Sequence, residues 1–148
     1  MEEKEKDIVV DGPGIVAEIL NRMKPENKEK IVKAIALSNP TIATKIEEKL
    51  YRFDDLIDLT PQSVQKLIGE VDHRDIVISL KTASEKAKDA LLQNMSDRKR
   101  ELVQTDFQAL PQMRLSDIEG AQRRILKKLD ELKIAGVART DSKHDVWV

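Results

Sequence analysis

Apolar residues recur at intervals of three and four positions along most of the chain, which is the spacing of one face of an α-helix. In the first 50 residues this pattern falls into three short segments, and each segment begins beside a proline: Pro13, Pro25 and Pro40. A proline in the first turn of a helix removes no intrahelical hydrogen bond, so it is well tolerated there. The pattern therefore predicts three short helices before residue 50.

Helix-start signals continue in the rest of the chain. Residues able to cap a helix precede four further apolar-periodic segments: Thr60, Asp72, Ser84 and Ser96. Ser116–Glu119 has the form of a capping box for a last helix that ends near Gly136. No segment of useful length alternates between apolar and polar residues as a strand would, so we expect an all-α fold of eight or nine helices.

The spacing of these segments also predicts how the chain is divided. We expect an armadillo-like helical triplet followed by a compact helical domain, because short helices joined by proline turns resemble a repeat that stacks on neighbours. The expected parts are an arm or linker at 1–12, the triplet at 13–50, a hinge at 51–60, the C-terminal helical domain at 61–136 and a tail at 137–148.

The hinge is predicted from Leu50, Tyr51, Arg52 and Phe53. Tyr51 and Phe53 are two positions apart, so their side chains point the same way only in an extended segment. We expect this extended link to have two packings, with the aromatic rings seated in either flanking part.

Six isoleucines give the triplet more apolar surface than three helices can bury against one another. We expect this self-association face to need a further layer, supplied by a second copy or by the rest of the chain. Its members are Ile15, Ile19, Ile31, Ile35, Ile42 and Ile46.

Composition narrows the function. Charged residues make up 36% of the 148 residues, against about 25% in an average domain, but the net charge is only −1. The basic run Arg98–Arg100 is flanked by Asp97 and Glu101 and has no aromatic residue beside it, so nucleic-acid binding is the weaker interpretation. No apolar stretch approaches the roughly 20 residues of a membrane span, and we expect a cytoplasmic protein without direct membrane insertion.

Catalytic chemistry is not apparent in the sequence. The chain has no cysteine, which excludes cysteine nucleophiles and zinc–thiolate sites. Its two histidines, His73 at a predicted helix start and His144 in the polar tail, lack metal-ligand spacing. Asp54, Asp55 and Asp58 lack the glycine and distal glutamate of a calcium loop. We therefore predict no enzyme activity, no cofactor and no metal.

The chain resembles the C-terminal region of the FliG family of bacterial flagellar motor switch proteins. The likeness rests on the segment from Ile76 to Leu132 and on matching segments upstream. The motifs that carry it are VAEILN at 16–21, LYRFDDL at 50–56, GEVD at 69–72, LKTA at 80–83, NMS at 94–96, RL at 114–115, and DIE with AQ at 117–122.

This resemblance implies a charged ridge that meets the stator of the motor. The ridge positions carried over are Lys81, Arg98, Asp106 and Arg114. Thr105 stands where the family has the first of two adjacent acidic residues, which weakens the acidic part of the ridge. Exposed charge pairs contribute only about 0–1 kcal/mol each, which suits weak and rapidly exchanging contacts.

The function implied is a non-enzymatic rotor or switch component of the flagellar motor. Its partners would be the cytoplasmic loop of a MotA-like stator, the switch protein FliM and another copy of the chain, at the cytoplasmic face of the basal body. The alternative is a helical-repeat adaptor or a regulatory FliG-like paralogue acting outside the torque-generating ring. Thr105, and the lack here of the family's N-terminal and middle domains, favour this alternative.

Overall fold

A computed structural model describes residues 10–140 of the chain. Over these residues the prediction of an all-α fold is confirmed, since every element is helical apart from one isolated bridge between Leu59 and Thr140. The chain divides into two compact units, unit 1 at Met1–Leu50 and unit 2 at Tyr51–Val148. The arm at 1–9 and the end of the tail at 141–148, which includes His144, lie outside the described residues.

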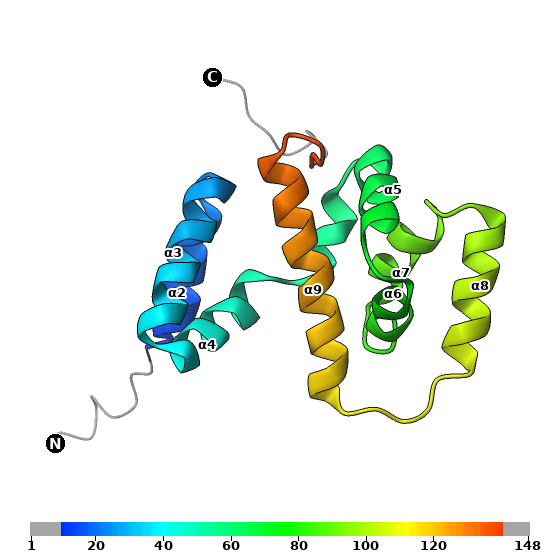
Figure 1. Ribbon diagram of the computed structural model, residues 1–148, viewed down its shortest axis with the longest axis horizontal. Helices are drawn as coiled ribbons and strands as arrows, with labels where there is room; N and C mark the ends of the chain where they lie inside the picture. The colour runs from blue at the N-terminus through cyan, green and yellow to red at the C-terminus, as the bar shows by residue number, and fades with distance from the viewer. Residues whose placement is uncertain (1–9, 141–148) are drawn as a thin grey trace, which may run out of the picture. The chain divides into compact units, whose positions relative to one another are not determined.

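Unit 1 is a triplet of short helices (Figure 1). They are α2 (Gly12–Asn21), α3 (Pro25–Ser38) and α4 (Pro40–Leu50). Two starts are capped by side chains: Asp11 Oδ1 accepts from the Gly14 N–H at 3.1 Å, and Asn39 Oδ1 accepts from the Ile42 N–H at 3.2 Å. Prolines open all three helices, as the sequence predicts.

The core of unit 1 is small. Helix α4 packs against both α2 and α3, and most of the buried side chains line these two contacts. They are Ala17, Leu20, Val32, Ala43, Ile46 and Leu50. Several large apolar side chains remain exposed, and Leu37 is the extreme case at 89%.

Unit 2 contains a 3₁₀ helix followed by five α-helices. They are η1 (Phe53–Asp58), α5 (Pro61–Glu70), α6 (His73–Ser79), α7 (Glu85–Leu92), α8 (Asp97–Gln108) and α9 (Leu115–Ile134). The four predicted caps are confirmed, because the side chains of Thr60, Asp72, Ser84 and Ser96 each accept a hydrogen bond from a backbone N–H in the first turn. Helix α6 lies between α8 and α9 (Figure 1).

The predicted capping box before α9 is wrong. The N-cap is Arg114, with an extended backbone and no side-chain cap, and Ser116 lies inside the first turn. The helix begins earlier because the Arg114 carbonyl already accepts from the Asp117 N–H at 3.0 Å.

The end of α9 follows the expected glycine signal. Gly136 has φ +75°, a conformation that glycine adopts without a steric penalty. Its N–H donates to the Lys133 carbonyl at 3.0 Å, and the Val137 N–H donates to the Leu132 carbonyl at 2.8 Å. These two bonds form the Schellman motif that closes many helices.

The residues after α9 are pinned to the start of α5. The Arg139 N–H donates to Ser63 Oγ at 2.7 Å, and the Arg139 carbonyl accepts from the Thr60 N–H at 3.1 Å. Ala138 is buried in the core beside them. The first residues of the predicted tail are therefore part of unit 2.

The predicted extended link at 51–60 is corrected by η1. Phe53 and Leu56 are buried in the core of unit 2, and the Asp55 N–H donates to the Arg52 carbonyl at 2.9 Å. Leu50 is the buried last residue of α4 in unit 1, and Tyr51 packs against the core of unit 2. A turn with a period near three places Phe53 and Leu56 on one side, which the two-residue spacing of the aromatic rings did not indicate.

The core of unit 2 is continuous from η1 to α9. Its fully buried large side chains are Leu56, Val64, Leu67, Ile76, Leu91, Val103 and Ile125. No helix between residues 10 and 140 combines the length and the apolar composition needed to cross a bilayer. In the same range, no three histidine or carboxylate side chains are grouped as metal ligands would be.

Candidate functional site: the charged ridge

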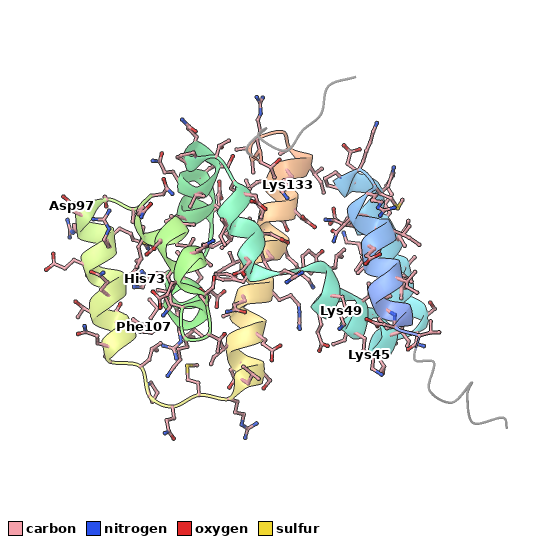
Figure 2. The ribbon with its side chains drawn as sticks, turned by 180° about the vertical axis from the view of Figure 1, so that it is seen from behind. Lys45, Lys49, His73, Asp97, Phe107 and Lys133 are labelled. Carbon is pink, nitrogen blue, oxygen red and sulfur yellow. The ribbon has the colours of Figure 1, made fainter. Side chains whose placement is uncertain are left out.

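Helix α8 carries the centre of the charged ridge, defined as Lys81, Arg98, Asp106 and Arg114. Val103 on this helix is fully buried and fixes the inward side. Arg98, Leu102 and Thr105 are exposed at intervals of four and three residues, so they form one outward stripe. Figure 2 labels Asp97 at the beginning of α8 and Phe107 near its end.

The three cations of the basic run Arg98–Arg100 do not form a single patch. Arg98 is exposed and has no partner among the described residues. Arg100 instead turns toward α7, where Nε donates to the Leu92 carbonyl at 2.8 Å and Nη2 donates to the Met95 carbonyl at 3.1 Å. Lys99 is part-buried and turns toward α6. Only Arg98 of this run is available to an outside partner.

Asp106 is exposed, but its carboxylate contacts a side chain of the neighbouring helix α6. Its Oδ2 lies 2.7 Å from Nε2 of His73, the first residue of α6. The other ring nitrogen, His73 Nδ1, lies 3.0 Å from Nζ of Lys99. The only carboxylate of the charged ridge therefore already has a cationic or hydrogen-bonding neighbour within unit 2.

Lys81 follows α6 and contacts the connection between α8 and α9. Its Nζ donates to the Pro111 carbonyl at 2.9 Å, so the side chain is half-buried and directed along the protein surface. The same turn is fixed from α9 by Gln122, whose amide donates to the Ser79 carbonyl at 2.8 Å and to Thr82 Oγ1 at 3.0 Å. Lys81 thus orders the segment that leads to Arg114.

Arg114 is exposed at the start of α9 and has no partner among the described residues. The structure brings three ridge residues to one end of unit 2: Asp106 near the end of α8, Lys81 on Pro111, and Arg114 three residues later. Arg98 lies about 12 Å away along the axis of α8, given the rise of 1.5 Å per residue. The ridge is therefore an elongated row of charges.

A groove of about 360 Å³ lies beside Asp106. It runs between the beginning of α6 and the segment that follows α8. Its lining residues are His73, Arg74, Val77, Asp106, Ala109, Leu110 and Pro111. The groove has an apolar wall, and the contact between His73 and Asp106 lies on its rim.

One ion pair ties α6 to α9 beneath the ridge. Nε and Nη2 of Arg124 donate to the two carboxylate oxygens of Asp75 at 2.9 and 2.8 Å. These bonds raise the pKa of Arg124 above its ordinary value. The Asp75 side chain is only 15% exposed, so the pair supports the packing of the two helices.

The predicted self-association face is only partly available on unit 1. Ile15 and Ile19 are 51% and 56% exposed, and Ile42 is also exposed. Ile31 and Ile35 are half-buried. Ile46 is 2% exposed in the core, because it lies on the side of α4 that meets the other helices.

Sequence reasoning missed the contribution of His73 and Lys99. In the sequence His73 is only a histidine at a predicted helix start without metal-ligand spacing, and it lies 33 positions before Asp106. Periodicity within α8 indicates that Lys99 and Asp106 lie on the same side of the helix, but it does not show which helix faces them. No local signal connects these three residues.

Comparison with known proteins gives a consistent result. The model of the FliG C-terminal domain family matches residues 33–138. The chain is 33% identical over 127 residues to the flagellar motor switch protein FliG of Thermotoga maritima, covering 86% of this chain and 38% of that protein. With FliG of Helicobacter pylori it shares 30% identity over 139 residues, covering 94% of this chain and 40% of that protein.

Solved structures agree with the sequence relatives. Full-length FliG from Aquifex aeolicus superposes with a TM-score of 0.72 at 29% identity, over 90% of this chain and 41% of that one. A Helicobacter pylori FliG fragment superposes with a TM-score of 0.63 at 28% identity, over 90% of this chain and 59% of that one. The chain thus spans about two fifths of the full-length relatives that it matches. By sequence and by fold, it belongs to the FliG C-terminal domain family.

Proposed function

We propose that this chain acts in the rotor and switch of a bacterial flagellar motor, as a non-enzymatic component that receives force through the charged ridge. The observation that carries this proposal is the exposure of Arg98 and Arg114, which have no partner among residues 10–140 and which match ridge positions in the resemblance to the FliG family. The adaptor outside the motor, the alternative from the sequence, gains no support from relatives that are named as motor switch proteins.

The charges of the ridge indicate what it binds. Arg98 and Arg114 have no ion-pair partner in the part of the chain that the structure describes, Asp106 is paired with His73, and position 105 is a neutral threonine. The surface that meets this ridge should therefore offer carboxylates to the two arginines. Exposed pairs of this kind contribute little affinity and mainly steer the approach, which allows repeated contact and release.

The partner that fits this role is the cytoplasmic loop of a MotA-like stator. The switch protein FliM is the proposed second partner, and the proposed location is the cytoplasmic face of the basal body. Both are carried over from the resemblance to the FliG family, whose matching members are named as flagellar motor switch proteins.

Unit 1 is the proposed site of self-association. Ile15, Ile19 and Ile42 leave an apolar surface that a second copy can cover, while Ile46 is already buried. Sedimentation of the chain with Ile19→Lys should then show less dimer than the parent at the same concentration. Equal dimer in both would contradict this face.

Of the four residues predicted to form the hinge, Leu50 belongs to α4 and Phe53 to η1. We therefore limit the proposed hinge to Tyr51 and Arg52, which lie outside the helices. From the sequence alone, Phe53→Ala should loosen the joint while leaving both parts folded. Because Phe53 is buried in unit 2, the same substitution is now expected to cost about 3–4 kcal/mol of that unit's stability.

The ridge is tested by charge reversal in the source organism. Arg98→Glu should sharply reduce swarming because it repels the partner's carboxylates, whereas Arg98→Ala should reduce it only in part. Lys66→Glu is the matched control, since Lys66 is an exposed lysine on α5, a helix that carries no residue of the charged ridge. Circular dichroism should show all three variants folded.

Two further variants examine the acidic position. Asp106→Lys should impair swarming. The family resemblance alone predicts that Thr105→Asp strengthens stator coupling by restoring the acidic pair, whereas a partner that offers carboxylates to Arg98 would be repelled by a new carboxylate on the same exposed stripe. If Arg98→Glu and Asp106→Lys both swarm like the parent while the chain supports motility, this surface does not receive the force.

A further inference from the structure

Three side chains from α6 and α8 form one continuous hydrogen-bonded row. Lys99 Nζ lies 3.0 Å from His73 Nδ1, and His73 Nε2 lies 2.7 Å from Asp106 Oδ2. His73 is the first residue of α6, whereas Lys99 and Asp106 lie on α8, seven positions apart. The row thus crosses from one helix to the other and back.

The groups on either side of His73 determine which nitrogen of its imidazole ring carries the proton. The ammonium of Lys99 has only protons to donate, so His73 Nδ1 must accept and carries no proton. The remaining ring proton is then on Nε2, where it donates to the Asp106 carboxylate. The arrangement selects the tautomer with its ring proton on Nε2, because a proton on Nδ1 would face the lysine's own N–H groups.

From this geometry we propose that His73 is a positioning residue of the charged ridge, which holds the Asp106 carboxylate on the rim of the groove while Lys99 sets the ring tautomer. This inference rests on the proposed function of the ridge. It assigns a role to two residues outside the four that the family resemblance indicates.

The physical benefit is a preorganised carboxylate. An exposed aspartate on a helix samples several rotamers, and a partner must then order it at the moment of contact. The bond to His73 holds Oδ2 toward α6 beforehand. The bond also keeps the negative charge away from the outward stripe, where Arg98 is left uncompensated.

The first test measures the ring directly on the purified chain. Nitrogen-15 chemical shifts of the His73 ring should show the tautomer with its proton on Nε2, and His144→Gln leaves His73 as the only histidine to assign. Lys99→Met should shift the Nδ1 signal, because it removes the donor at that atom. A ring protonated at Nδ1, or an Nδ1 signal insensitive to Lys99→Met, would overturn the proposal.

The second test asks whether the row matters for binding. The probe is the purified cytoplasmic loop of the source organism's stator protein, titrated against the parent chain and its variants. His73→Ala should weaken binding about two- to tenfold, the range expected for one lost hydrogen bond. His73→Gln should recover most of this loss, because its amide offers both an N–H donor and a carbonyl acceptor.

A double variant separates positioning from general packing. His73→Ala with Asp106→Ala should bind no more weakly than Asp106→Ala alone, since His73 acts through that carboxylate. Additive losses, or a failure of His73→Gln to improve on His73→Ala, would overturn the proposal. Thermal unfolding of each variant shows whether unit 2 remains folded.

Failure of the underlying function gives a different result. If the ridge does not meet the stator, Arg98→Glu binds the loop and swarms like the parent, and the inference about His73 falls with it. If the ridge does meet the stator but His73 does not position Asp106, Arg98→Glu weakens binding while His73→Ala leaves it unchanged.

Discussion

The two units of this chain differ in how completely they bury their large apolar side chains. Over residues 10–50, unit 1 has three helices and a small core, and it leaves Ile15, Ile19 and Leu37 largely exposed. Unit 2 closes around a continuous core from η1 to α9, and its outward positions on α8 are mostly charged or polar. One unit therefore offers apolar surface to a partner, and the other offers charge.

This difference indicates two kinds of contact. An apolar face gains free energy in proportion to the area that a neighbouring layer covers, so it favours a lasting association. A row of exposed charges gains little static affinity and exchanges rapidly. Within a rotor, the first kind of surface suits assembly and the second suits repeated contact with a moving partner.

The largest expected loss of stability comes from shortening a buried side chain in the core of unit 2. Leu56→Ala removes a fully buried side chain of η1 and should cost about 2–5 kcal/mol, because a closed core cannot collapse around the cavity. Hydrogen exchange should show faster exchange throughout unit 2 with unchanged protection in α2–α4. Leu20→Ala in unit 1 is the matched variant. Equal loss of protection in both units after either substitution would contradict their independence.

A smaller effect is expected from the ion pair that ties α6 to α9. Arg124→Met should destabilise unit 2 by about 1–2 kcal/mol, because it leaves the poorly exposed Asp75 carboxylate without its two donors. Urea unfolding measures the loss. Lys128→Met is the control, since its ion pair with Glu131 is on the surface of the same helix, and it should leave the midpoint unchanged. Similar shifts for both variants would show that the burial of Asp75 is unimportant.

Much of the fold was predictable because its signals are local. A cap, a proline and an apolar residue every three or four positions lie within one or two turns, so the caps at Thr60, Asp72, Ser84 and Ser96 follow directly from the sequence. The predicted start of α9 is wrong because residues 116–119 have the composition of a capping box. The backbone of Arg114 begins the helix two residues earlier.

The parts that could not be predicted depend on contacts between distant segments. The 3₁₀ helix η1 is stabilised by burial of Phe53 and Leu56 against later helices, which the local sequence of an expected link does not encode. The exposure of Arg98 follows from helical periodicity, whereas the pairing of Asp106 with His73 requires the packing of α6 on α8. Charges near the ridge were therefore identified, but their partners were not.

The cap of α2 offers a test confined to the smaller unit. Asp11→Ala should destabilise unit 1 by about 1 kcal/mol, since the Asp11 carboxylate accepts from the Gly14 N–H and also lies 3.7 Å from Lys49 Nζ. Gly14→Ala should disturb the same cap, because its Cβ would collide with that carboxylate, although the better helix propensity of alanine offsets part of the loss. Hydrogen exchange of α2 is the measurement, and unchanged exchange in both variants would contradict the cap. Unit 2 should not respond to either substitution.

The smallest expected effect concerns Asp55 on η1, whose ionised carboxylate is partly desolvated and therefore lowers the stability of unit 2 slightly. Desolvation raises the pKa of the Asp55 carboxyl, against the opposing influence of a backbone hydrogen bond at Arg52 and the charge of Lys133. An acid with a raised pKa binds its proton more tightly in the folded state, so the ionised group lowers stability above that pKa and the penalty disappears as the pH falls through it. Asp55→Asn should therefore be more stable than the parent at neutral pH. The gain should be under about 0.5 kcal/mol, because the residue keeps much of its exposure to solvent.

Thermal unfolding from pH 3 to pH 7 should show the parent and Asp55→Asn alike at the acid end and separating as the pH rises. Asp89→Asn, at an exposed aspartate of α7, measures the general effect of removing one surface charge. A variant less stable than the parent at neutral pH would mean that the favourable contacts of the Asp55 carboxylate outweigh its desolvation.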